Sequence, residues 1–163
     1  MRLALFEPEI PQNTGTLLRL GACLGVCIDI IEPCGFIMNE RRMRRAGMDY
    51  ISLATMKRHT NWAAFYQESE QQNRRLVLID PAAPCTHIDF KFHPDDTLLL
   101  GRESSGFSPQ IHRQVPLKTR IPMVKEARSL NVAIAGALVL GEALRQVRAF
   151  SSFSDLSRNG NSL

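Results

Sequence analysis

The sequence predicts an α/β fold built on a parallel sheet and folded as a single domain. Short apolar runs recur along the chain, and most are followed by proline, glycine or a polar turn, a pattern typical of strands buried on both faces. Longer segments with helical spacing of apolar residues alternate with these runs. With 163 residues, 44% of them hydrophobic, the chain is long enough to form one core without a disulfide or a metal.

The first unit is a strand, a helix and a second strand. The strands are the apolar runs Leu3–Phe6 and Ile28–Ile31. Asn13 or Thr14 is predicted to cap the helix between them, because short polar side chains accept hydrogen bonds from the free amides of a helix start. Gly25 is predicted to end this helix, because glycine adopts the left-handed conformation common at helix C-termini.

The next elements continue this alternation. A basic helix is predicted near residues 39–46, and another near 60–72 that starts at Thr60 or Asn61. Two further apolar runs are predicted to be strands, Leu76–Ile79 and Leu98–Leu100.

The last long segment, residues 131–150, is predicted to be a helix with one buried face. Small residues such as Ala135 and Gly136 near its start permit close approach of another backbone, either within the fold or across a dimer. Residues 1–150 form the predicted domain. Residues 151–163 are mostly Ser, Asn, Gly and charged, and are predicted to be a flexible, dispensable tail.

Composition argues against several classes of protein. No window approaches the run of roughly 18 apolar residues that a membrane-spanning helix requires, and the first residues are too briefly apolar for a signal peptide. A cytoplasmic protein without a membrane partner is therefore expected. The four cysteines lack C-x-x-C spacing and neighbouring histidine pairs, so no metal site is predicted.

Positive charge is concentrated in residues 41–58. This stretch holds six basic residues against one acid, Asp49, for a net charge of +5, whereas the whole chain carries +4. A local basic patch favours a polyanionic partner, although a solvated arginine-rich helix explains the same pattern equally well. The nucleic-acid-binding residues predicted here are Arg41, Arg42, Arg44, Arg45, Lys57 and Arg58.

Three segments break the apolar pattern with small and polar residues at predicted strand ends, where open α/β sheets place ligands. The first, residues 7–15, leads to Arg19, a charge on the second turn of a mostly apolar helix. Either a substrate contacts this charge, or the aliphatic part of the Arg19 side chain extends along the surface so that the guanidinium reaches solvent. The second, residues 98–107, contains Gly101 and Gly106, which allow the backbone to approach a ligand closely.

The third segment, residues 120–133, contains Ser129 and Asn131. One of them is expected to cap the last helix, and both flank Leu130 in a way that would also line a small-molecule pocket. None of the three segments matches a phosphate-binding P-loop or a dinucleotide fingerprint, and the chain has no nucleophile elbow. The histidines lie outside these segments and are predicted at the surface: His59, His87, His93 and His112.

In this order, the segments resemble the three motifs of the SPOUT methyltransferases, in the TrmH-like group of RNA 2′-O-ribose methyltransferases. The resemblance covers about residues 1–149. It is carried by Glu7-Pro8-Glu9-Ile10-Pro11-Gln12-Asn13-Thr14-Gly15, Arg44-Arg45-Ala46-Gly47-Met48-Asp49-Tyr50 and Arg120-Ile121-Pro122-Met123, which are similar to the short members that modify the wobble nucleotide of tRNA.

The resemblance implies a C-terminal trefoil knot, an exception to the usual absence of knots, and a homodimer. It also implies that S-adenosylmethionine binds in the knot and that S-adenosylhomocysteine is the product. The cofactor-binding residues it implies are Ile79, Gly101, Ile121, Met123, Ser129 and Leu130. Asp80-Pro81 departs from the Thr-Thr pair common at this place in the family.

The implied activity is 2′-O-methylation of a wobble cytidine or modified uridine in the anticodon stem-loop, with leucine tRNAs as substrates. The implied catalytic residues are Arg19, Glu103, Asn13, Ser129 and Asn131. A guanidinium has a pKa above ~12 and seldom gives up its proton, so we expect Arg19 to stabilise the developing oxyanion rather than act as a base. Alternatives are an RNA-binding module that has lost catalysis and a 2′-O-methyltransferase for another RNA.

Overall fold

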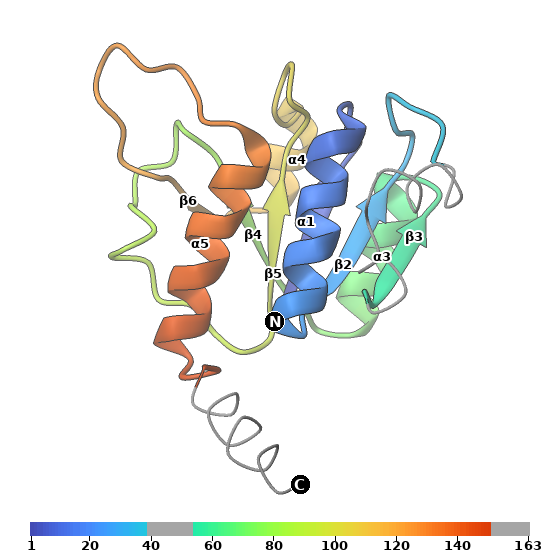
Figure 1. Ribbon diagram of the computed structural model, residues 1–163, viewed down its shortest axis with the longest axis horizontal. Coiled ribbons are helices and arrows are strands. Elements are labelled where there is room, and N and C mark those ends of the chain that lie inside the picture. The colour runs from blue at the N-terminus through green and yellow to red at the C-terminus, as the bar shows by residue number, and fades with distance from the viewer. Residues whose placement is uncertain (39–53, 151–163) are drawn as a thin grey trace, which may run out of the picture.

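A computed structural model describes residues 1–38 and 54–150 of the chain (Figure 1). The predicted basic helix near 39–46 and the predicted tail 151–163 lie outside these residues. Within the described ranges, no helix is long and apolar enough to cross a bilayer. The same ranges contain no group of three His, Cys, Asp or Glu side chains placed to hold a metal ion.

The described residues form a sheet of six parallel strands in the order β3-β2-β1-β5-β4-β6. Its two central strands, β1 (Arg2–Phe6) and β5 (Asp96–Leu100), are far apart in sequence but pair directly. The α/β fold with a parallel sheet is therefore confirmed. The other strands are β2 (Cys27–Ile31), β3 (Met56–His59), β4 (Arg75–Ile79) and β6 (Lys118–Thr119).

Helices cover both faces of the sheet. Figure 1 shows α1 (Pro11–Leu24) and α5 (Val132–Gln146) side by side on one face. On the other face, α3 (Trp62–Gln71) and α4 (Pro109–Gln114) contribute Phe65 and Ile111 to a second apolar cluster. The trefoil knot implied by the resemblance stays a prediction.

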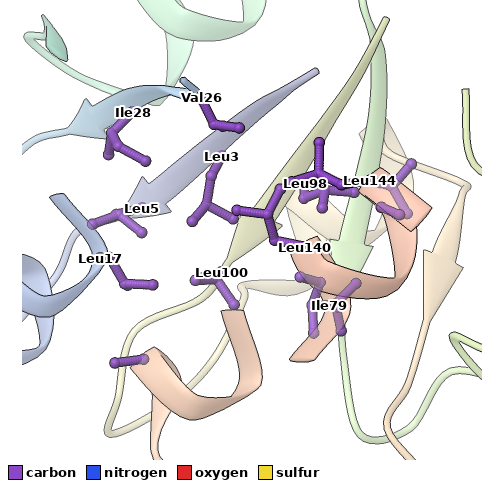
Figure 2. Close-up of a cluster of buried hydrophobic side chains, with 14 of the residues drawn as sticks. Leu3, Leu5, Leu17, Val26, Ile28, Ile79, Leu98, Leu100, Leu140 and Leu144 are labelled. Carbon is purple, nitrogen blue, oxygen red and sulfur yellow. The ribbon is translucent and has the colours of Figure 1, made fainter. Parts of the chain in front are cut away.

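Alternation along β1 divides the core between the two faces. Leu3 and Leu5 pack toward α1 and α5, whereas Ala4 and Phe6 pack toward α3 and α4, because successive side chains of a strand point to opposite faces. Figure 2 shows the first cluster, in which leucines of β1 and β5 meet those of α1 and α5. The side chains of Leu3, Ala4, Leu5 and Phe6 are all buried, as expected for a parallel sheet covered on both sides.

Several predicted elements are confirmed. The four apolar runs all lie in strands. Gly25 ends α1 with a φ of 62°, in the left-handed region. Asn61 caps α3 by accepting a hydrogen bond from the Ala64 amide, and Asn131 caps α5 by accepting from the Ala133 and Ile134 amides.

The predicted start of α1 is wrong. Neither Asn13 nor Thr14 caps this helix, which begins at Pro11 with Ile10 at the cap position and no side-chain cap. Proline suits the first turn because it lacks the amide hydrogen that would be unsatisfied there. Asn13 therefore lies inside the helix, where its side chain is available for other contacts.

Other differences concern short elements. The sequence did not predict β3 or α4, which have only four and six residues and so carry little periodicity. The two-residue strand β6 lies directly before the third polar segment, residues 120–133, and α5 ends at Gln146, short of residue 150. Gly136 does permit a close approach within the fold: a Cβ there would lie 2.8 Å from side-chain atoms of Leu17 and Leu100.

A buried carboxylate lies on the α3 face of the sheet. Asp29 of β2 is fully buried and accepts hydrogen bonds from Arg2 Nε and Nη2, at 2.6 and 2.7 Å. Nε2 of the buried His59 lies 2.9 Å from the same carboxylate, and Arg74 Nη1 lies 3.9 Å away. Asp29 thus joins the first three strands of the sheet with charged hydrogen bonds.

Candidate active site

A cavity of about 610 Å³ opens at the carboxyl ends of β1, β5 and β4. This is where open parallel sheets bind ligands, and the volume is typical of cofactor sites. Parts of all three polar segments singled out in the sequence contribute to its walls. The lining includes Ile10, Asn13, Ile79, Asp80, Leu100, Gly101, Arg102, Glu103, Ser104, Phe107, His112, Ile121, Met123, Ser129, Leu130 and Asn131.

Asn13 joins two distant segments at one end of this cavity. Its Nδ2 donates a hydrogen bond to Glu103 Oε1 at 3.1 Å, and its Oδ1 accepts one from Asn131 Nδ2 at 2.9 Å. The side-chain oxygen of Asn131, Oδ1, is occupied in capping α5. Because both amide ends of Asn13 have a partner, its orientation is fixed, and the side chain is only 8% exposed.

Glu103 is a fully engaged carboxylate. Besides the Asn13 amide, it accepts hydrogen bonds from the backbone amides of Glu9 at 2.8 Å and Ile10 at 3.3 Å. Carboxylates that accept two or three amide hydrogen bonds are held firmly in one position. Its geometry suits a positioning role, in which it holds the start of α1 against the end of β5.

Glu9 returns this contact, a feature that the sequence did not reveal. Its carboxylate accepts from the Ser104 amide and hydroxyl, both at 2.8 Å, and from Arg102 Nη2 at 3.1 Å. The amide hydrogen bond from Ser104, supported by its hydroxyl, lowers the pKa of Glu9. Arg102 also lies 3.2 Å from Glu7. Each of the two segments, after β1 and after β5, therefore supplies a carboxylate that accepts hydrogen bonds from backbone amides of the other.

The turn after β5 requires glycine at both of its ends. A Cβ on Gly101 would lie 2.8 Å from backbone atoms of Gly106, closer than real Cβ atoms approach. The two backbone hydrogen bonds between Arg102 and Gly106 close this turn, and Gly106 has a φ of 63°. The sequence predicted that these glycines let the backbone approach a ligand. In the structure, they let the backbone at the two ends of the turn approach each other within the cavity wall.

The predicted site residues divide into two groups. All six predicted cofactor-binding residues line the cavity, as do Asn13, Glu103, Ser129 and Asn131. Arg19 does not: it is exposed on α1, six residues beyond Asn13 and so about 9 Å farther along the helix axis. The structure therefore does not bring Arg19 together with the other predicted catalytic residues, all of which line the cavity.

The predicted nucleic-acid-binding residues are only partly described. Arg41, Arg42, Arg44 and Arg45 lie outside the described residues. Lys57 and Arg58 lie on the edge strand β3, and each is paired with an acid, Lys57 with Glu68 at 2.6 Å and Arg58 with Glu32. These ion pairs offset the positive charge that the two residues add to the patch.

The prediction that all four histidines lie at the surface is wrong for His59. His59 is 5% exposed and bonded to Asp29, and His112 lines the cavity. A sequence cannot show this, because each histidine is brought to its partner by strand order rather than by nearby residues. Asp80 also lines the cavity, at the end of a strand where sequence analysis noted only a departure from the family pattern.

Comparison with known proteins agrees with this geometry. Residues 1–141 match the SpoU rRNA Methylase family. A protein of Beijerinckia indica subsp. indica named tRNA (cytidine(34)-2'-O)-methyltransferase is 50% identical over 96% of this chain and 98% of the relative.

Two solved structures have the same fold. One, described as "Structural insights into the 2-OH methylation of C/U34 on tRNA", is 34% identical, with a TM-score of 0.82 over 89% of this chain and 94% of the other. The second is the SpoU methyltransferase AviRb of Streptomyces viridochromogenes in complex with AdoMet. It is 25% identical, with a TM-score of 0.79 over 90% of this chain and 60% of the other.

Proposed function

This chain belongs to the SpoU rRNA methylase family, and on that premise we propose that it methylates the ribose 2′-hydroxyl of nucleotide 34 in tRNA. S-adenosylmethionine is the methyl donor, as in its AdoMet-bound relative. The observation that carries the proposal is the strand-end cavity, where hydrogen bonds join Asn13, Glu103 and Asn131 from three separate segments. The choice of nucleotide 34 follows the curated relative and the solved structure described above. A cytoplasmic location and leucine tRNA substrates belong to this proposal.

The cavity suits S-adenosylmethionine in size and in chemistry. Apolar side chains of Ile79, Ile121, Met123 and Leu130 offer surface for an adenine ring, and Gly101 and Gly106, which have no side chains, also line the cavity. Polar side chains line the same cavity, and a combination of apolar surface with placed polar groups is usual for a cofactor site. When bound, the cofactor supplies an electrophilic methyl group on a positively charged sulfur.

The residues of the chain act by positioning and by electrostatics. Glu103 and Asn131 hold the amide of Asn13 in one orientation, so that its remaining hydrogen-bonding capacity can orient the ribose. Ser129 extends this polar edge of the cavity. The role assigned to Arg19, which lies on α1 outside the cavity lining, is to stabilise the 2′ oxygen as it becomes negative. Prealignment of this kind holds the ribose 2′ oxygen and the methyl carbon ~3–3.5 Å apart, and so lowers the entropic cost of bringing them together.

The direct test is transfer of labelled methyl from S-adenosylmethionine to tRNA, followed by nuclease digestion and mass analysis. We expect a 2′-O-methyl nucleoside at position 34, with leucine tRNAs labelled in preference to other tRNAs. Label in another RNA would favour the alternative substrate, and cofactor binding without transfer to any RNA would favour a binding module. Label at another tRNA position would contradict the proposal.

The basic stretch should supply the tRNA footprint. Replacing Arg41, Arg42, Arg44 and Arg45 by glutamate is expected to weaken tRNA binding at least about 100-fold and to flatten its salt dependence, because fewer counterions are released on binding. The matched control is Lys57→Glu with Arg58→Glu, for which we expect a smaller loss because both residues are already paired with acids. Filter binding at several salt concentrations measures both effects, and unchanged affinity in the fourfold variant would refute the footprint.

The homodimer implied by the family suits the outer face of α5. Ile134 and Leu138 lie one turn apart on this helix and are 52% and 47% exposed, beside the neighbouring helix α1. Replacing both with aspartate is expected to raise the dimer dissociation constant at least about 100-fold, because two charges would then be desolvated. Ile88→Asp, at a residue that is 62% exposed and off this face, is the control. Sedimentation velocity measures the change; a double variant that sediments like the unmodified chain would place any dimer interface elsewhere.

A further inference from the structure

Two titratable side chains face each other in the cavity and have no part in the mechanism above. Asp80 follows β4 directly, and His112 lies on α4. The His112 Nδ1 lies 3.5 Å from Asp80 Oδ2. Both residues line the cavity, and their side chains are 30% and 15% exposed for His112 and Asp80.

The Asp80 carboxylate is held in place from two sides. Its Oδ1 accepts a hydrogen bond from the Ala82 amide at 2.8 Å, and its backbone amide donates to the Thr119 carbonyl at 2.9 Å, which anchors it to β6. Oδ2 accepts no hydrogen bond from any residue within 1–38 and 54–150, since His112 approaches only to ion-pair distance. The phenyl ring of Phe107 packs edge-on against the His112 imidazole and limits its movement.

The other charged side chains of the cavity wall already have ion-pair or hydrogen-bond partners within the chain. Arg102 is paired with Glu7 and Glu9, and Glu103 accepts its three hydrogen bonds from the segment that begins α1. An ionised carboxylate offers about four acceptor positions, of which Asp80 uses one. A mostly buried carboxylate with open acceptor positions is unfavourable unless water or a ligand supplies donors, and a ligand that fills the cavity must replace the water.

We propose that Asp80 binds the cofactor by accepting a hydrogen bond from one of its donor groups, and that His112 is a positioning residue for this carboxylate. The inference rests on the proposed function, since it assigns a role in the same cavity. S-adenosylmethionine and its product offer three kinds of donor: the adenine amino group, the ribose hydroxyls and the α-ammonium group. A carboxylate with open acceptor positions at this place adds selectivity for ligands that carry such donors.

The test measures binding of S-adenosylhomocysteine and of 5′-methylthioadenosine by titration calorimetry, without RNA or turnover. 5′-Methylthioadenosine keeps the adenine and ribose but lacks the amino-acid group. Asp80→Asn is expected to weaken S-adenosylhomocysteine about 10-fold or more, because a hydrogen bond to a charged acceptor is lost. An equal loss for both ligands assigns the donors that they share, on the adenine and the ribose, and a loss confined to S-adenosylhomocysteine assigns the α-ammonium. The matched control is Asp95→Asn, the same change at an exposed residue just before β5.

The role of His112 has a separate readout. His112→Ala is expected to weaken S-adenosylhomocysteine a few-fold in the unmodified chain and to add no further loss beside Asp80→Asn, because a residue that acts through another shows no effect once its partner is gone. Unchanged thermal midpoints would establish that the variants fold. Unaltered affinity in Asp80→Asn would overturn this inference alone, whereas failure of the unmodified chain to bind S-adenosylhomocysteine would overturn the proposed function with it.

Discussion

Replacing Arg19 by alanine is expected to lower the rate of methyl transfer to tRNA about 100- to 1,000-fold. The guanidinium is the cation assigned to the developing 2′ oxyanion, and removal of one prealigned donor of this kind typically has an effect of that size. Because Arg19 does not line the cavity, binding of S-adenosylhomocysteine should be unchanged. Single-turnover transfer with saturating cofactor, together with calorimetric titration, measures the two quantities separately.

Two further variants test the assignment of Arg19. Arg19→Lys keeps the charge but loses the planar fork of donors, so only part of the rate should return. Arg145→Ala removes an exposed arginine near the end of α5 that pairs with Glu142, and it should leave the rate unchanged. Full turnover by Arg19→Ala would show that oxyanion stabilisation comes from another group.

Replacing Asp29 by alanine is expected to lower the free energy of unfolding by about 3–5 kcal/mol. Removing one partner of a buried ion pair leaves the other without compensation, and here Arg2 and His59 would both lose their carboxylate. Urea denaturation followed by circular dichroism measures the loss. Asp95→Asn, an exposed carboxylate changed to an amide, should stay within about 0.5 kcal/mol of the unmodified chain; an equally stable Asp29→Ala would show that the pairs contribute nothing net.

The same carboxylate should make stability depend on pH. Burial raises the pKa of Asp29, but the hydrogen bonds from Arg2 and His59 outweigh burial, so the pKa is lowered overall. A lowered pKa in the folded state contributes stability above the unfolded value of ~3.9, and this contribution is lost as pH falls through the folded value. The unfolding free energy of Asp29→Asn should therefore fall less steeply below about pH 4. Parallel pH profiles of the two proteins would contradict this.

The sequence by itself determined the elements whose signals are local. The apolar run Leu3–Phe6 predicts a buried strand because every residue of it is apolar, and β1 is buried accordingly. Gly25 and Asn61 predict a helix end and a helix start because each effect depends on the conformation or side chain of one residue. The three polar segments were also recognisable, since each interrupts an apolar pattern at a strand end, and all three contribute to the cavity.

Only the tertiary structure decided which of these residues meet. Asn13 and Asn131 are 118 positions apart in sequence and form a hydrogen bond. Glu9 is 95 positions from Ser104 and accepts hydrogen bonds from its amide and its hydroxyl. Asp80 and His112 come together across the cavity without any pattern that links them in the sequence. Propensity and periodicity depend on the nearest few residues, whereas such contacts depend on the order and register of β1, β5 and β4, which the packing of the whole core selects.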